Sequence, residues 1–178
     1  MYLIIIILVI TLIIAFSFID TSNNINKTEL TVEESKSSIE IALIKRYDTL
    51  TESVKCAKEY ANMETNLILE VTKARKGVSI KEIEKVSEQQ KKAVESINAV
   101  AENYPNLKSD TLYQTIQKQL SEENEWLAAT KRVYNSNVKQ YNLLIVNFPS
   151  SIVASMRGKS KMEFIHEDVT DKKTLRLF

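Results

Sequence analysis

An uninterrupted apolar run near the start of the chain constrains its fold more than any other feature. The run is YLIIIILVITLIIAFSFI, Tyr2 to Ile19, and it contains no charged residue and no proline. As a helix it would extend about 27 Å, close to the roughly 30 Å hydrocarbon core of a bilayer. In a soluble protein such a segment would have to be buried on every side. We therefore expect residues 1–19 to form a transmembrane anchor whose partner is the lipid bilayer.

The alternative is a cleaved signal peptide, because AFS at Ala15 to Ser17 fits a small-x-small cleavage site. A signal peptide normally has Lys or Arg before its apolar run, and Met1 and Tyr2 supply neither. Lys27 and Lys36 follow the run. By the positive-inside rule we expect a single-pass cell-membrane protein with its N-terminus outside and its C-terminal domain in the cytoplasm.

The remaining composition favours helices. The chain has Gly 2 and Pro 2, far below the usual fractions of about 7% and 5%. Lys+Arg 24 against Asp+Glu 23 argues against a nucleic-acid binder, which normally carries a basic excess. Cys56 is the single cysteine, so no intramolecular disulfide can form.

Helical periodicity continues through most of the chain after the anchor. Residues typical of helix ends divide this pattern into segments. The stretch RYDTLTES spaces Thr49 and Glu52 as a capping box, which predicts a new helix start there. Gly77 suits a helix C-cap, and Ser79 with Glu82 forms a second capping box. Pro105 in NYPNLK predicts a reversal before the last helix.

These signals predict an all-α fold, with the N-terminal transmembrane helix followed by an antiparallel four-helix bundle. We assign residues 20–37 to a juxtamembrane segment and the start of the first bundle helix. Residues 38–149 form the bundle, and residues 150–178 form a C-terminal tail. The last helix is predicted over Leu107 to Phe148.

The last helix carries a seam in which steps of three and four alternate, as in a helix packed against partners. The seam consists of Tyr113, Ile116, Leu120, Glu123, Leu127, Thr130, Tyr134, Asn137, Tyr141, Leu144 and Phe148. Its polar members Glu123, Thr130 and Asn137 are seven residues apart. They would fix the register of the bundle by hydrogen bonding, or they would lie on a surface for a partner.

A Tyr-Asn pair repeats at the same interval, as Tyr134 with Asn135 and Tyr141 with Asn142. Such rings could pack while the amides bind carbonyl groups. These four residues join the polar seam positions as candidate interaction or registry positions.

The remaining residues predict no catalytic, cofactor-binding or metal site. His166 in FIHEDVTD has acidic neighbours, but adjacent residues in a solvated tail do not readily enclose a metal. Cys56 would need a nearby base to act as a nucleophile, and His166 is far away in sequence. We expect no enzyme activity and no cofactor.

Several segments resemble the LemA family of single-pass membrane proteins with a helical bundle. They are the arginine–aspartate segment IEIALIKRYDTLTESV, the Glu-Val-x-x-Ala-Arg pattern in EVTKAR, AENYPNLKSDTLYQTIQKQL, YNSNVKQYNLLIVNFPSSIVA and KMEFIHED. The resemblance covers roughly residues 38 to 168, and it includes the turn Tyr104, Pro105, Asn106, Leu107 and Lys108. It implies an N-terminal anchor and an antiparallel bundle. The biochemical activity of the family is poorly defined, and one branch is associated with magnetosome assembly.

The chain departs from the family pattern at five positions. Thr51 and Glu52 replace Pro-Asn, so the break there is expected to be softer. Lys36 stands where a tryptophan is common. Asn124 and Lys131 replace a Glu and an Arg, which would weaken an ion pair between them.

Three functions follow as hypotheses. The favoured one is a membrane-anchored interaction or scaffold module that binds another protein without catalysis. The alternatives are a self-assembling structural membrane protein and a secreted helical binding protein released by signal cleavage.

Overall fold

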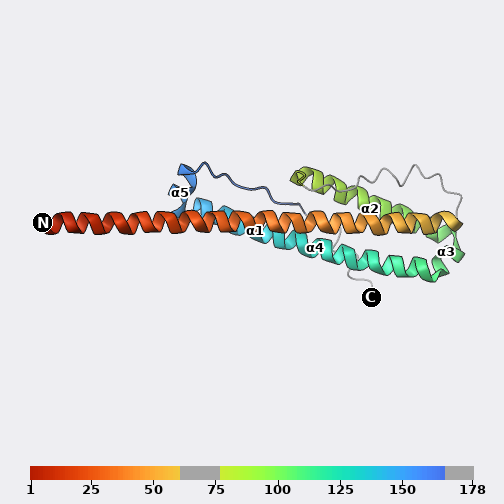
Figure 1. Ribbon diagram of the computed structural model, residues 1–178. Coiled ribbons are helices and arrows are strands. Elements are labelled where there is room, and N and C mark those ends of the chain that lie inside the picture. The colour runs from red at the N-terminus through yellow and green to blue at the C-terminus, as the bar shows by residue number, and fades with distance from the viewer. Residues whose placement is uncertain (61–76, 167–178) are drawn as a thin grey trace. The chain divides into compact units, whose positions relative to one another are not determined.

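The computed structural model describes residues 1–60 and 77–166 of the chain, and these residues contain helices and no strand (Figure 1). The helices are α1 (Tyr2–Tyr60), α2 (Ile80–Asn103), α3 (Pro105–Ser109), α4 (Thr111–Val146) and α5 (Ser150–Met156). The all-α fold class is therefore confirmed for the described residues.

The chain forms two compact units. The anchor unit comprises Met1–Ser35 and Tyr134–Phe164, and the core unit comprises Lys36–Val133 and Ile165–Phe178. Helices α1 and α4 each contribute residues to both units.

The apolar run forms the first part of α1 and is not packed against the other residues that the structure describes. Its large apolar side chains are 37% (Phe18) to 79% (Tyr2) exposed. Among the described residues, α1 is the one helix long and apolar enough to cross a membrane. A helix that is apolar and exposed on all sides fits a membrane protein.

The predicted helix start at RYDTLTES is wrong, because α1 continues through it to Tyr60. Thr49 does not cap a helix. Its hydroxyl donates to Glu123 Oε1 at 2.9 Å and lies 3.4 Å from the carbonyl of Lys45. The softer break expected from Thr51 and Glu52 is thus no break at all.

The predicted start of α2 is confirmed. Ser79 is the N-cap residue, and its side chain accepts a hydrogen bond from the amide of Glu82 at 3.3 Å. Gly77 has a φ of 78°, in the left-handed region that glycine adopts without strain. The helix that Gly77 was expected to end, and the EVTKAR motif, lie outside the described residues.

The single last helix predicted from Leu107 to Phe148 is wrong at both ends. Pro105 starts the short helix α3, and α4 begins only after Asp110. The Asp110 carboxylate accepts hydrogen bonds from the amides of Leu112 (2.7 Å) and Tyr113 (3.0 Å), which is N-cap geometry. At the other end, α4 stops at Val146.

Described residues of α1, α2, α3 and α4 together form an apolar cluster in the core unit. Its members are Leu50, Val54, Cys56, Ala57, Ala93, Ile97, Ala101, Leu107, Tyr113, Ile116 and Leu120. The described residues supply three long helices, where the sequence predicted four bundle helices. The first two predicted bundle helices are joined in α1, as far as the described residues reach.

The predicted seam of α4 is buried in its first half and drifts in its second. Thr130, Asn137 and Leu144 are half-buried and Phe148 is 82% exposed, whereas Val138 and Ile145 are buried. A straight helix turns once every 3.6 residues, so a pattern repeating every 3.5 residues drifts by about 20° per heptad. In the second half, Val138 and Ile145 are therefore buried in place of Asn137 and Leu144, while Tyr134 and Tyr141 stay buried.

Candidate functional site

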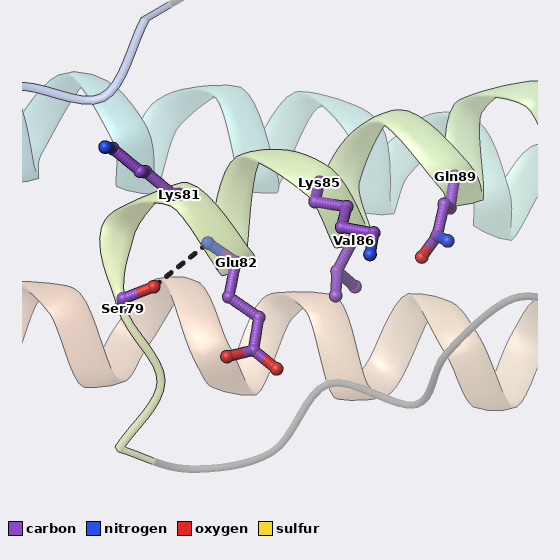
Figure 2. Close-up of a pocket in the computed structure, with 6 residues that line it drawn as sticks. All are labelled: Ser79, Lys81, Glu82, Lys85, Val86 and Gln89. Carbon is purple, nitrogen blue, oxygen red and sulfur yellow. Dashed lines mark hydrogen bonds between the residues drawn. The ribbon is translucent and has the colours of Figure 1, made fainter.

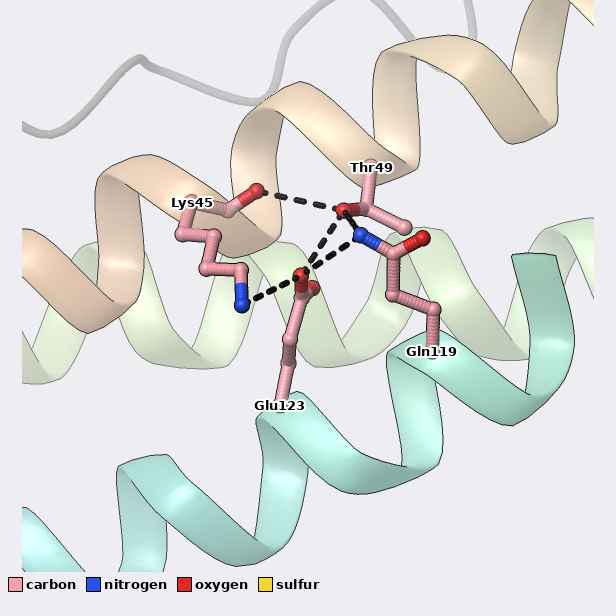
Figure 3. Close-up of polar contacts among 4 residues, drawn as sticks. All are labelled: Lys45, Thr49, Gln119 and Glu123. Atoms are coloured by element: carbon pink, nitrogen blue, oxygen red, sulfur yellow. Dashed lines mark hydrogen bonds and ion pairs between the residues drawn. The ribbon is translucent and has the colours of Figure 1, made fainter.

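The predicted registry position Glu123 lies in a buried polar centre of the core unit. We define this centre as Lys45 and Thr49 of α1 with Gln119 and Glu123 of α4 (Figure 3). The Glu123 side chain is 2% exposed. Its Oε1 accepts hydrogen bonds from the Thr49 hydroxyl at 2.9 Å and from Gln119 Nε2 at 3.3 Å. Gln119 Nε2 also donates to Thr49 Oγ1 at 3.2 Å, so the three side chains form one network.

Lys45, at the exposed edge of this centre, lies close to the Glu123 carboxylate. Lys45 Nζ lies 4.0 Å from Oε1, and the lysine side chain is 57% exposed. The same ammonium lies 5.7 Å from the centre of the Trp126 ring, in range of a cation–π contact. Glu123 Oε2 is buried and has no hydrogen-bond partner among the described residues. A registry role for Glu123, in which this carboxylate and its partners on α1 and α4 specify how the two helices pair, stays a prediction.

The other polar seam positions differ from Glu123. Thr130 is half-buried, and its hydroxyl donates to the carbonyl of Leu127 in its own helix at 2.9 Å. Asn137 is also half-buried. The seven-residue row therefore does not form one buried polar stripe, because the helix rotates these positions away from the packed face.

The Tyr-Asn pairs lie in the anchor unit and hold a later segment of the same chain. The side-chain amide of Asn142 donates to the carbonyl of Met162, and its side-chain oxygen accepts from the amide of Met162, both at 2.9 Å. The buried Tyr134 donates its hydroxyl to the carbonyl of Glu163 at 3.0 Å. These contacts bind peptide groups without requiring a particular side chain at 162 or 163.

The other two members of the pairs occupy different environments. Tyr141 is 1% exposed, and burial raises its pKa, as burial also raises that of Tyr134. Asn135 is half-buried. The structure thus brings Tyr134 and Asn142 to the same extended segment and keeps Glu123 in a different unit.

Residues 150–166, which the sequence assigns to a tail, have defined contacts in the structure. Ser150 begins α5, and its hydroxyl donates to the carbonyls of Leu144 (2.6 Å) and Asn147 (2.9 Å). Ile165 is buried in the core unit. Glu84 Oε1 accepts a hydrogen bond from the backbone amide of His166 at 2.9 Å. The same oxygen lies 3.1 Å from Nδ1 of the His166 ring. The His166 side chain itself is 90% exposed.

The family-motif turn connects α2 to α3. Tyr104 ends α2 and precedes α3, and Pro105 is at the start of α3. Leu107 is fully buried in the apolar cluster, whereas Asn106 and Lys108 are exposed. Leu107 therefore packs the turn against the apolar cluster of the core unit.

The departures at Asn124 and Lys131 lie on α4, whereas those at Lys36, Thr51 and Glu52 lie within α1. Lys131 Nζ donates to the Ser87 hydroxyl of α2 at 2.8 Å, and Asn124 is half-buried. The lysine therefore links α4 to α2.

The Cys56 thiol is buried, and burial is the main cause that raises its pKa, with Asp110 and Glu59 adding to it. A raised pKa disfavours the reactive thiolate. Over residues 1–60 and 77–166, no group of three or more His, Cys, Asp or Glu side chains is placed to hold a metal ion.

A shallow hollow runs beside the first turns of α2. Its lining residues are Ser79, Lys81, Glu82, Lys85, Val86 and Gln89 (Figure 2). All six come from one helix and its cap, and the hydrogen bond between Ser79 and Glu82 is the N-cap contact. Figure 2 shows Lys81 directed away from Glu82 and Gln89, so the charged groups do not converge on a ligand position.

The model of the LemA family matches residues 35–176. This match covers α2, α3, α4 and α5, together with the part of α1 that packs in the core unit. The chain belongs to the LemA family. The LemA resemblance carried by the sequence motifs is thereby confirmed.

Two relatives support the assignment to the LemA family. Protein LemA of Metamycoplasma hominis is 26% identical over 144 residues, which cover 78% of this chain and 66% of the relative. Magnetosome protein MamQ of Magnetospirillum gryphiswaldense is 25% identical over 75 residues, covering 42% of this chain and 28% of that protein. The chain thus spans slightly less than two thirds of the first relative and about a quarter of the second.

Sequence reasoning missed the partners of Glu123. Thr49 was interpreted as a helix cap from its local spacing with Glu52, although its position in the apolar pattern of α1 also fits a buried face. Gln119 lies four residues before Glu123, a spacing that places two side chains together on a helix. That spacing could have identified Gln119 as a partner.

Proposed function

We propose that this LemA-family chain is a membrane-anchored helical protein whose folded part binds another protein as an interaction or scaffold module, without catalysis. The continuity of α1 carries the proposal. Its exposed apolar run, Tyr2 to Ile19, passes without a break into residues such as Leu50 and Val54 of the buried core. One helix that enters the bilayer and also supplies the core would tether the folded part to the membrane.

The proposed module is an antiparallel helical bundle. Near the start of α2, Ser87 contacts Lys131 of α4 at 2.8 Å, and later in α2, Asn98 accepts from the Tyr113 hydroxyl at 3.4 Å. Residue numbers rise along one helix as they fall along the other, which supports antiparallel packing of α2 and α4.

The outer side of α4 offers a surface for the partner. Trp126 and Val133 are 39% and 54% exposed and lie seven residues apart, and Leu112 near the start of α4 is 59% exposed. Exposed apolar side chains one heptad apart, as Trp126 and Val133 are, offer a surface on which an amphipathic helix can pack. The proposed partner is therefore a protein that presents such a helix, and a second copy of this chain is the alternative.

Crosslinking in native membranes tests the proposal. A photoreactive residue at Val133 is expected to capture a different protein, whereas the same residue at the exposed polar position Lys118 of α4 is the matched control. A ladder of multiples of the chain's own mass would instead support the self-assembling structural protein. Absence of any crosslink at Val133 would contradict the interaction surface.

The proposed orientation places the folded part in the cytoplasm. Lys27 and Lys36 follow the apolar run, which supports this orientation by the positive-inside rule. A Ser160→Cys variant in a Cys56→Ala background places one thiol at an exposed position. An impermeant maleimide is expected to label it only after cell lysis, and labelling in intact cells would place the folded part outside.

The secreted alternative predicts a different product. Signal cleavage would yield a soluble form that lacks the apolar run, whereas the anchored protein retains it. The intact mass of the membrane-bound protein separates the two.

A further inference from the structure

An exposed apolar patch lies at the end of α4 and along α5 in the anchor unit. Phe148, Ile152 and Met156 are 82%, 53% and 73% exposed and follow one another at intervals of four residues. The opposite side of α5 is packed, since Val153 and Ala154 are buried. Helix α5 therefore has an inner apolar face that is covered and an outer apolar face that is open.

The end of α5 is fixed in its place. The amide of Gly158 donates to the carbonyl of Ser155 at 3.0 Å, and the amide of Lys159 donates to the carbonyl of Ala154 at 3.0 Å. With Gly158 at a φ of 63°, these two bonds form a Schellman motif. The direction in which the chain leaves α5 is thereby defined.

The residues after α5 attach it to α1 directly beyond the apolar run (Figure 1). Arg157 Nη1 donates to the carbonyl of Ser22 at 3.0 Å and to its hydroxyl at 2.7 Å. Lys159 forms an ion pair with Glu29. Ser22 lies three residues after Ile19, which is about 4.5 Å along a helix axis.

Packing of the anchor unit begins at this same level. Every residue from Met1 to Asp20 is exposed, Thr21 and Ser22 are half-buried, and Ile25 is fully buried. No spacer separates the apolar run from the folded part. The polar layer of a bilayer is about 5 to 7 Å thick on each side of the hydrocarbon, so Ser22 would lie within it when the run spans the membrane.

We propose that the α4–α5 turn and α5 form a second membrane contact, in which Phe148, Ile152 and Met156 insert into the interface of the bilayer that α1 crosses. Apolar side chains at this depth contact the boundary between headgroups and acyl chains. The exposed basic residues Arg157 and Lys161 follow α5 and would face anionic headgroups. The lipid bilayer is the occupant because Arg157 holds the end of α5 at Ser22, three residues beyond the apolar run, which would put the patch beside the membrane that α1 crosses. This inference rests on the anchoring in the proposed function.

Fluorescence of the full-length chain in vesicles tests the inference. A Cys56→Ala background receives a single cysteine by Ile152→Cys, labelled with an environment-sensitive fluorophore, in phosphatidylcholine and phosphatidylglycerol vesicles with brominated acyl chains. The label is expected to shift its emission to the blue, to be quenched by the brominated lipid, and to lose quenching by aqueous iodide. Met156→Cys is a second site and should give the same result.

Two further sites separate failure of the inference from failure of the anchor. Leu30→Cys is the matched control, because Leu30 is 55% exposed in the same unit but lies about 16 Å beyond Ile19 along α1, where iodide should quench the label. Leu12→Cys reports on the apolar run itself. The inference would be overturned if iodide quenched the label at Ile152→Cys as strongly as the label at Leu30→Cys. If brominated lipid still quenched the label at Leu12→Cys in that experiment, the anchor would stand.

Two other outcomes also overturn the inference. Protection of the Ile152 label from both quenchers would mean that a protein, a second copy or a partner, covers α5. Absence of lipid quenching at Leu12 would refute the anchoring and the inference together.

Discussion

The core unit and the anchor unit use polar residues of the same helix in different ways. In the core unit, Glu123 of α4 bonds to the side chains of Thr49 and Gln119 within a buried network. In the anchor unit, Asn142 of α4 bonds to both backbone groups of Met162. The first arrangement requires matched side chains on two helices, whereas the second requires a suitable side chain on one element only.

This difference has an energetic consequence. A buried carboxylate that loses a donor retains its desolvation cost, so changes around Glu123 should be non-additive. Loss of Asn142 should release one segment locally, because the peptide groups of residue 162 can bond to water instead.

The apolar core of the core unit should outweigh either polar arrangement. Leu120 is 1% exposed, so Leu120→Ala is expected to lower the free energy of unfolding by about 2–5 kcal/mol through lost burial and a residual cavity. Urea unfolding followed by circular dichroism measures this change. Leu112→Ala at an exposed position of α4 is the control and should change it by less than about 0.5 kcal/mol. Equal effects at both positions would mean that α4 does not pack through Leu120.

The buried polar centre should show coupling between its two helices. Thr49→Val removes the 2.9 Å bond to Glu123 and is expected to cost about 1–3 kcal/mol, because a buried carboxylate loses a donor. Glu123→Leu removes the charge, and the double variant should cost less than the sum of the single changes by about 0.5–3 kcal/mol.

A double-mutant cycle in urea measures this coupling energy. Thr51→Val is the matched control, because the Thr51 hydroxyl bonds only within α1, to the carbonyl of Tyr47. Strict additivity of Thr49→Val and Glu123→Leu would show that Glu123 does not fix the pairing of α1 with α4.

The Asn142 contact should be local. Asn142→Ala removes two hydrogen bonds to Met162 and is expected to cost about 1 kcal/mol, with faster hydrogen exchange of the Met162 amide. Exchange of amides in α2 should stay unchanged. Gln140→Ala at an exposed position of α4 is the control. Accelerated exchange throughout the core unit would contradict the contrast between the two arrangements.

The weakest effect should be an acid-dependent release of His166. The backbone amide of His166 bonds to the Glu84 carboxylate and is the main cause that lowers the pKa of Glu84. Because the pKa of Glu84 is lower in the folded protein, the bond between Glu84 and His166 stabilises the fold fully above the ordinary Glu pKa of about 4.3. This stabilisation is lost as the pH falls through the lowered pKa of Glu84. The amide resonance of His166 should follow this titration.

Glu84→Gln should abolish the titration of the His166 resonance. Glu102→Gln, at an exposed position of α2, should leave it intact. If the resonance titrates equally in the Glu84→Gln protein, Glu84 does not hold this segment.

Local patterns in the sequence predicted the features that depend on local physics. The apolar run from Tyr2 to Ile19 predicted an exposed apolar helix, because its composition leaves no polar face. Ser79 predicted the start of α2, because a cap needs one side chain and a nearby amide. The near absence of glycine and proline, together with the helical periodicity, predicted an all-α fold.

Predictions failed where a distant partner competes with a local signal. Thr49 and Glu52 have the spacing of a capping box, but the Thr49 hydroxyl finds Glu123, 74 positions later, and α1 continues. Phe148 fits the heptad pattern, yet Val146 ends α4 and Phe148 is exposed. The true rotation of the helix, and not the idealised seam, selects Val138 and Ile145 for burial.

Contiguous residues are sufficient to identify the membrane-type segment, the helical class and the family motifs, because each of these depends on local composition or spacing. The bonds from Asn142 to residue 162 and from Arg157 to Ser22 become apparent in the folded chain alone. These contacts join residues 20 and 135 positions apart, and their geometry depends on how α1, α4 and α5 pack. Side-chain chemistry restricts what such residues can bond to, but packing brings the partners within 3 Å.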